Sequence, residues 1–153
     1  MRSKYHLGIF LFVLFLLVAG IWFFIKQRDR TPDFIQSGTL GSVQLTVHRI
    51  QESDLADDSN LAEVKGSDVE QYDIYELSLT AHSGDISEFL DKEKVTLLSP
   101  TGENISIFRW LSVNKDSHHP TFLAWFTKVE TTPVQMKIMG PDAKNVSLTW
   151  SDL

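Results

Sequence analysis

The strongest constraint on this chain is an uncharged apolar run near its start, LGIFLFVLFLLVAGIWFFI, which extends from Leu7 to Ile25. A helix of that length is about 28 Å long at about 1.5 Å per residue, close to the hydrocarbon thickness of a bilayer. Basic residues flank the run on both sides. We therefore expect residues 1–6 to form a short basic tail and residues 7–25 to form one transmembrane helix.

A cleaved signal peptide is the competing interpretation, because Val18-Ala19-Gly20 offers the small residues that a cleavage site needs. The apolar run continues through Ile25, however, whereas the apolar core of a signal peptide has about 7–15 residues. A short basic tail, an apolar segment and a long polar domain form the layout of a signal anchor, and long domains translocate largely regardless of charge. We expect an uncleaved single-pass anchor in the cell membrane, with a cytoplasmic N-terminus and an extracytoplasmic C-terminal domain.

Charge divides the chain at the same place. Residues 1–30 contain five of the fourteen basic residues and one of the twenty acidic residues. Residues 31–153 therefore contain nine basic and nineteen acidic residues, a formal charge of −10. Binding of nucleic acid needs clustered Lys and Arg, so we expect no nucleic-acid partner. Cysteine is absent from the chain. That absence excludes disulfides and thiolate chemistry, and in an extracytoplasmic domain it favours a bacterial source.

Alternating apolar side chains predict the structure of the rest of the chain. Residues 26–41 are polar and contain Pro32 and two glycines, so we expect a linker there and a folded domain in residues 42–153. Period-two alternation indicates strands. It occurs in seven segments, namely 43–47, 75–81, 95–98, 105–110, 122–126, 134–138 and 146–150, and both faces of 122–126 are apolar. Residues 51–71 break the pattern. Within them, an exposed acidic loop that can include a helical turn is predicted by Ser53, Asp54, Asp57, Asp58, Ser59 and Asn60.

Seven short strands separated by turn signals predict an all-β fold, an antiparallel immunoglobulin-like β-sandwich, with a small β-barrel as the alternative. A short basic tail, one helix and a Cys-free sandwich resemble the membrane-anchored immunoglobulin-like domains of bacterial envelopes. The resemblance covers the whole layout and rests on no signature motif. It implies an extracytoplasmic β-sandwich domain and no particular activity.

His118 and His119 are the first candidates for chemistry. In a loop, two adjacent imidazoles could both reach one Zn²⁺ or Cu²⁺. A convincing site needs a third ligand, which His48 or His82 would supply only if the fold brought it near. Since this spacing matches no standard ligand pattern, we interpret them as surface histidines and expect no bound metal and no other cofactor.

The remaining motifs give weaker support for a specific function. Asp54, Asp57 and Asp58 offer oxygen ligands for Ca²⁺, but without the alternation and central glycine of an EF-hand loop they indicate a solvated acidic loop. No G-x-S-x-G elbow or phosphate-binding loop occurs, and we expect no catalytic residues and no enzyme activity. Trp110 stands at the end of an expected strand, beside a polar loop, and is an interface candidate together with His118 and His119.

These observations favour a non-enzymatic domain of the cell envelope, tethered to the membrane through residues 7–25, that binds a protein partner or supports a membrane complex. A metal-binding or metal-delivery protein that uses His118 and His119 is the alternative. A hydrolase is the third possibility, and no motif selects its residues.

Overall fold

The structure is a computed structural model that describes residues 34–56, 61–140 and 144–151. The expected basic tail and transmembrane helix, at 1–6 and 7–25, lie outside these residues, as do Asp57 and Asp58. Within the described ranges, no helix combines the length and the apolar character that a membrane crossing requires.

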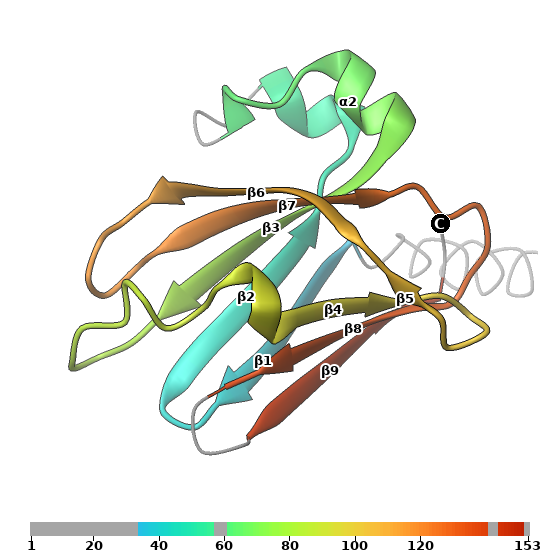
Figure 1. The fold of residues 1–153 in the computed structure, drawn as a ribbon. Coiled ribbons are helices and arrows are strands. Elements are labelled where there is room, and N and C mark those ends of the chain that lie inside the picture. Colours follow the sequence, from blue (N-terminus) through green and yellow to red (C-terminus); the bar gives the residue numbers. More distant parts are fainter. Residues whose placement is uncertain (1–33, 57–60, 141–143, 152–153) are drawn as a thin grey trace, which may run out of the picture. The chain divides into compact units, whose positions relative to one another are not determined.

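The described chain forms two antiparallel sheets (Figure 1). The first has the strand order β1-β2-β3-β7-β6, with β1 at Ile35–Leu40, β2 at Val43–Arg49, β3 at Tyr72–Thr80, β7 at Thr121–Thr127 and β6 at Ile107–Asn114. The second has the order β5-β4-β8-β9, with β5 at Asn104–Ile105, β4 at Val95–Leu98, β8 at Val134–Met139 and β9 at Asn145–Trp150. The described residues are therefore all-β in class, as the alternation predicts.

Nine strands are present in the described residues where seven were expected. Strand β1 occupies Ile35–Leu40, a range expected to belong to the linker, and the strand expected at 105–110 is divided into β5 and a longer β6 that continues to Asn114. In β1 only Leu40 is buried, because this strand lies at the edge of its sheet. An edge strand with polar side chains has no apolar alternation by which its sequence could be distinguished from a linker.

The main core lies between the two sheets and follows the alternation in the sequence. The inward side chains of β2 are Val43, Leu45 and Val47, and those of β3 include Leu77 and Leu79. The second sheet contributes residues of the same kind, and this core also contains Leu97, Phe122, Phe126, Val134, Met136, Ile138, Leu148 and Trp150.

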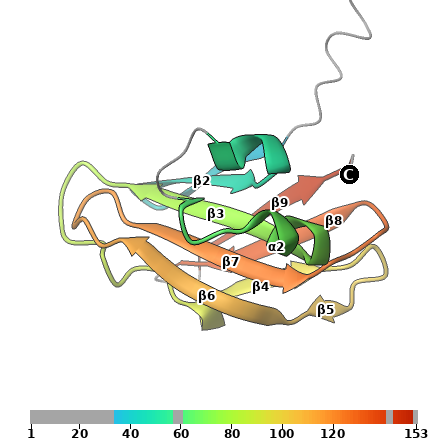
Figure 2. The same ribbon diagram turned by 90° about the horizontal axis from the view of Figure 1, so that it is seen from above.

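A second core covers the outer face of the five-stranded sheet. Residues 51–56 and 61–71, here called the helical cover, contain the 3₁₀ helix η1 (Glu52–Ala56) and the helix α2 (Gly66–Gln71). The helical cover lies over β2, β3 and β7 (Figure 2). Its Leu61 and Val64 are buried against Ile74, Leu123 and Trp125. The helical turn expected beside the acidic residues corresponds to η1, whereas the burial of the apolar residues that follow was not predicted. The two cores explain why β7 is apolar on both faces.

Gly38 sets how closely the edges of the two sheets approach. A Cβ at Gly38 in β1 would lie 2.7 Å from Val146 Cγ1 and 3.3 Å from Val146 Cγ2 in β9. Valine has few alternative rotamers, so the neighbouring side chain cannot move away cheaply. We expect Gly38→Ala to lower the free energy of unfolding by about 1–3 kcal/mol, as overpacking does. Chemical denaturation measures this change.

Gly66 is the matched control for that substitution. A Cβ at Gly66, the first residue of α2, would meet no atom within 4 Å. We expect Gly66→Ala to leave the stability unchanged or to raise it slightly, because alanine favours a helix. Equal effects of the two substitutions would contradict the close contact between β1 and β9.

Candidate functional site

The antiparallel strands give the described domain two ends. At one end, Arg49 donates its backbone N–H to the Phe34 carbonyl (2.8 Å), and Tyr72 is paired with Thr127. We call this the Tyr72 end. At the other end, Asn114 is paired with Thr121 and the loop 115–120 joins β6 to β7. We call this the histidine end, because the loop contains His118 and His119.

The loop at the histidine end is organised around Asp116. Oδ1 of Asp116 accepts the backbone N–H groups of His118 (2.8 Å) and His119 (2.9 Å), and the Asn114 side chain donates to the His119 carbonyl (3.0 Å). The loop is also joined to the chain after β3, because Ala81 donates its backbone N–H to the His118 carbonyl (3.0 Å). Both histidines are exposed.

The hydrogen bonds to Asp116 lead us to expect that the order of this loop depends on pH. The two backbone N–H groups, of His118 first and His119 second, lower the pKa of Asp116 below its ordinary value. A carboxyl whose pKa is lowered by folding contributes stability above its ordinary pKa, and that stability is lost as the pH falls through the lowered pKa. We expect the hydrogen-exchange protection of the His118 and His119 amides to fall in that acidic range, and to be low at neutral pH in Asp116→Ala.

Protection of these two amides in Asp116→Ala equal to that in the unsubstituted protein would contradict the role of Asp116. The amide of Phe126, inside β7, is the internal control, because its protection should not change.

The structure does not gather metal ligands around the two histidines. In residues 34–56, 61–140 and 144–151, no three His, Cys, Asp or Glu side chains are placed to hold a metal ion. His48 lies on β2, where its Nε2 is 3.3 Å from Asp54 Oδ2 in η1. Asp54, a candidate calcium ligand, thus contacts His48, and it also accepts the Gln51 backbone N–H at 2.7 Å. Within the described residues the zinc or copper hypothesis therefore gains no third ligand, while two of the three calcium candidates, Asp57 and Asp58, lie outside those residues.

We expect calorimetric titration of the protein with Zn²⁺ to give no saturable binding at submicromolar affinity. Two exposed imidazoles with scattered carboxylates lack the three or four ordered ligands that a tight zinc site needs. One-to-one binding in that range, abolished by replacing His118 and His119 with alanine, would contradict this prediction and favour the metal-binding alternative.

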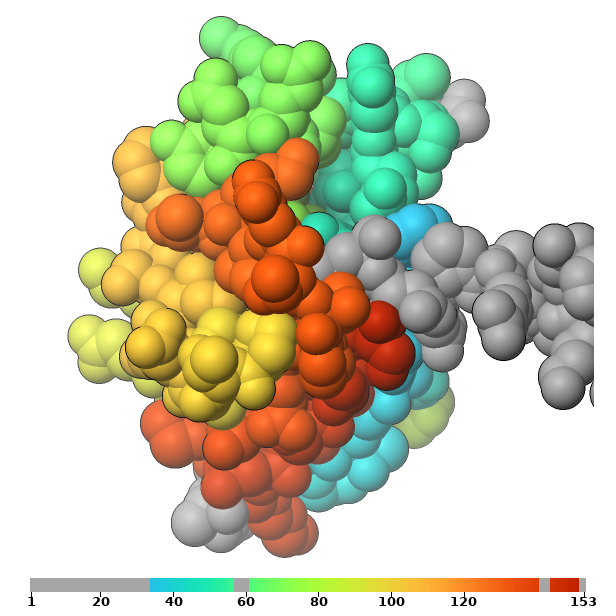
Figure 3. All heavy atoms as spheres, turned by 90° about the vertical axis from the view of Figure 1, so that its right-hand side faces the viewer, coloured from blue at the N-terminus to red at the C-terminus, as the bar shows by residue number. Residues whose placement is uncertain are grey.

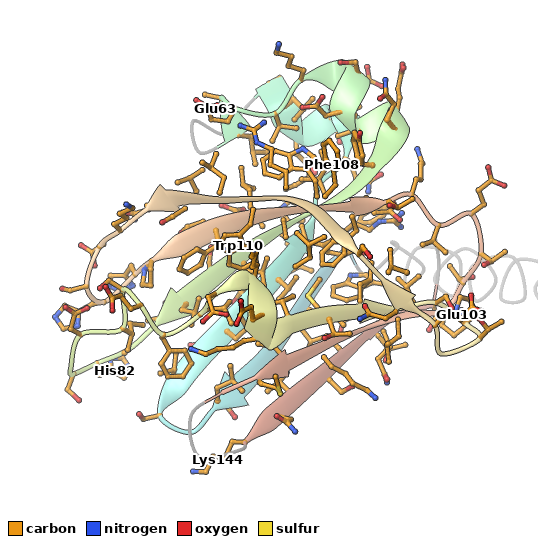
Figure 4. The ribbon with its side chains drawn as sticks, viewed as in Figure 1. Glu63, His82, Glu103, Phe108, Trp110 and Lys144 are labelled. Atoms are coloured by element: carbon orange, nitrogen blue, oxygen red, sulfur yellow. The ribbon has the colours of Figure 1, made fainter. Side chains whose placement is uncertain are left out.

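Trp110 lies within β6 rather than at its end, opposite Ala124 in β7. Its ring stacks on Phe122 with the centroids 5.3 Å apart, and it packs against the main core. The ring is half-buried. Trp110 is labelled in Figure 4, where it lies between the two sheets. Less of the Trp110 ring is therefore accessible to a partner than its expected place at a strand end, beside a polar loop, would allow.

A hollow opens at the Tyr72 end, with a volume of about 270 Å³. It lies where the chain leaves β2, where α2 leads into β3 and where β7 ends (Figure 3). Its walls are Ile50, Gln51, Val69 and Tyr72, together with the charged residues Arg49, Glu52, Glu70, Asp73 and Lys128.

A buried ion pair forms the floor of the hollow. Arg49 donates to Oδ1 of Asp73, and Oδ2 of Asp73 accepts the Val129 backbone N–H at 2.9 Å. The Arg49 and Asp73 side chains are both buried. Nearby, burial raises the pKa of the Tyr75 phenol well above its ordinary range, while Arg49 acts to lower it and Asp73 to raise it. Arg49 and Asp73 therefore neutralise each other, and neither charge is left for a ligand in the hollow.

The rim of the hollow carries one lysine, which bonds to backbone carbonyls, and two glutamates. Lys128 Nζ donates to the backbone carbonyls of Val69 (3.1 Å) and Glu70 (3.0 Å), at the C-terminal end of α2. Cations are favoured at that end of a helix. The carboxylates of Glu52 and Glu70 form no hydrogen bond or ion pair with any residue that the structure describes. Among the described residues, the hollow is thus lined by two exposed glutamates whose carboxylates have no partner there.

An exposed aromatic ring lies next to the hollow. Phe108 in β6 is 67% exposed, and its ring stacks on Tyr72 with the centroids 4.6 Å apart and the planes 15° from parallel. Figure 4 shows Phe108 on the side of β6 that faces α2. The neighbouring Arg109 places its guanidinium 4.6 Å from the centre of the Trp125 ring and 3.5 Å from Glu63. An aromatic surface therefore continues from the hollow along β6, beside an arginine whose charge is paired with Glu63.

No motif in the sequence points to Phe108, Tyr72 or the hollow. The pairing of β6 with β7 shifts between Ile107 and Arg109, so Phe108 and Arg109 both lie on the outer face. A bulge of this kind changes the side on which a residue points. The alternation rule alone would place consecutive residues on opposite faces, and it carries no signal for the bulge.

Comparisons with known proteins identify no family. No protein-family model matches the chain, and no curated protein matches it significantly. A crystal structure of a DUF4426 family protein from Pseudomonas aeruginosa PAO1 is similar, with a TM-score of 0.43 and 10% sequence identity, over 76% of this chain and 94% of that chain. This likeness is too distant to carry an argument about function, which has to come from the site.

Proposed function

We propose that the protein is a non-enzymatic interaction module of the cell envelope, tethered to the membrane, which binds another protein through the Tyr72 end. The observation that carries this proposal is the Phe108 ring, 67% exposed and stacked on Tyr72 at the rim of a hollow. One exposed aromatic residue needs no explanation by itself. Here the ring is held against a second ring beside Arg109, and aromatic residues and arginine are the types that dominate binding energy at interfaces.

The fold that we propose for this module is an immunoglobulin-like sandwich, with β1 as an added edge strand. Without β1, the sheet orders are β2-β3-β7-β6 and β5-β4-β8-β9. When these strands are lettered A, B, E, D and C′, C, F, G, they follow the chain in alphabetical order. The first sheet then has the order of the constant-type domain, and the second that domain's CFG sheet extended by C′. Such folds are common in recognition, although the fold alone does not establish the function.

The proposed location rests on the N-terminal sequence. The uncharged run 7–25 supports a single-pass anchor, and the absence of cysteine supports a bacterial extracytoplasmic domain. The charge of −10 on residues 31–153 would be repelled by an anionic lipid surface. Repulsion from lipid keeps a tethered domain available for a protein partner.

Site-specific photo-crosslinking in the native cells tests this proposal. p-Benzoylphenylalanine at position 108 preserves an aromatic ring, and Met139, which is 49% exposed at the end of β8, is the matched control position. We expect a discrete protein adduct from position 108 and none from position 139. No adduct at 108, or the same adducts at both positions, would overturn the proposed function.

A further inference from the structure

We propose that the partner inserts one basic side chain, arginine or lysine, into the hollow at the Tyr72 end. This inference rests on the proposed function and specifies the chemistry of the partner. It follows from the size of the hollow, the charges at its rim and the aromatic rings beside it.

The size of the hollow favours a single side chain. Its volume is about 270 Å³, whereas sites for drug-sized ligands and cofactors occupy about 300–1,000 Å³. A side chain from a partner fits such a space without any opening of the fold.

The charges at the hollow favour a cation. Arg49 is occupied by Asp73, and Lys128 by two backbone carbonyls. Glu52 and Glu70 remain with carboxylates that pair with none of the described residues. Residues 31–153 carry a formal charge of −10, so the wider field also attracts a basic partner.

The aromatic rings favour the same occupant. A guanidinium or ammonium group is attracted to the face of an aromatic ring within about 6 Å of its centre. Tyr72 lines the hollow and Phe108 stacks on it with an exposed face. The same surface already contains such an arrangement, because Arg109 lies 4.6 Å from the centre of the Trp125 ring. A partner's arginine would repeat this contact and reach a carboxylate at the rim.

Fluorescence anisotropy of a labelled peptide tests the proposal with the full-length chain in non-ionic detergent. The probe is fluorescein-Gly-Gly-Ala-Arg-Ala-Gly-amide, with matched peptides that carry lysine, citrulline or glutamate at the arginine position. Citrulline keeps the shape of arginine without its charge. We expect the arginine peptide to bind most tightly, lysine next, and citrulline about three- to tenfold more weakly than arginine, from one cation–π contact and a rim ion pair.

Substitutions separate this site from general attraction to an acidic protein. We expect the double variant Glu52→Gln with Glu70→Gln to bind the arginine peptide about three- to tenfold more weakly. We expect Phe108→Leu to lower the affinity for this peptide as well. The control pair is Glu88→Gln with Glu103→Gln, two exposed carboxylates that do not line the hollow. Circular dichroism verifies that each variant is folded, and the control pair should bind the peptide like the unsubstituted protein.

Several results would overturn the inference. Equal binding of the arginine and citrulline peptides would do so, and so would equal losses in the two glutamate pairs, which would indicate diffuse attraction. Dimerisation of the chain that Phe108→Leu abolishes would assign the hollow to a second copy. If the arginine peptide does not bind but the crosslink from position 108 forms, the inference of an inserted basic side chain is overturned and the proposed function stands. If no crosslink forms, the proposed function itself is overturned.

Discussion

Replacing Asp73 with alanine is expected to lower the free energy of unfolding by about 3–5 kcal/mol, as loss of one partner of a buried ion pair does. Arg49, 8% exposed, would keep its charge without the carboxylate that now accepts its hydrogen bond. The Val129 backbone N–H would lose its acceptor as well. Denaturation in urea measures the change.

Asp73→Asn and a double substitution separate the two contributions. Asparagine keeps an oxygen that can accept from Val129 but removes the charge opposite Arg49, so we expect an intermediate loss. Arg49→Met with Asp73→Leu removes both charges, and replacing a buried pair by apolar residues is often neutral. We expect that double variant to be more stable than Asp73→Ala. Its remaining loss is the Val129 hydrogen bond, which is partly buried and is worth about 0.5–1.5 kcal/mol. A double variant less stable than Asp73→Ala would contradict this account.

The second large effect is expected at Trp125, in the core under the helical cover. Its side chain is 1% exposed and packs with Leu61 and Val64 of the cover. We expect Trp125→Ala to lower the free energy of unfolding by about 3–5 kcal/mol, because a large buried side chain leaves a cavity. Arg109 would also lose the ring that it now covers.

Trp125→Phe is the control for this substitution. The Trp125 Nε1–H is buried and has no acceptor among the described residues. Phenylalanine keeps most of the apolar surface and removes this unpaired donor, whose burial costs about 1–3 kcal/mol. We therefore expect Trp125→Phe to lose much less stability than Trp125→Ala. Limited proteolysis should cut the helical cover faster in Trp125→Ala, and equal cleavage of both variants would contradict the packing of the cover on this ring.

Strands with a strong alternation were predicted well. The segments at 43–47, 122–126 and 134–138 coincide with β2, β7 and β8, and the apolar character of 122–126 on both faces matches the burial of β7. Strand β1 was missed because its polar side chains show no alternation. A helical turn was expected at the start of the helical cover, but its packing on the sheet was not, because its acidic residues outnumber the apolar residues, such as Leu61 and Val64, that it buries.

The candidate site was the least predictable part. His118 and His119 were selected because adjacent imidazoles are conspicuous in a sequence, yet they lie in a loop organised around Asp116. The Tyr72 end was not selected, since its residues come from β2, η1, α2, β3, β6 and the segment directly after β7. No local spacing connects these segments, and only the pairing of the strands brings Tyr72 and Phe108 together.

By itself, the sequence determined the all-β class and the inward faces of most strands, because alternation with a period of two is a local property of a half-buried strand. The prediction of an N-terminal anchor also rests on a local property, because it depends on one continuous apolar run. The tertiary structure alone decided the second core, the bulge that turns Phe108 outward and the hollow beside it. These features depend on contacts between residues far apart in the chain, and such contacts leave no periodic signal in the sequence.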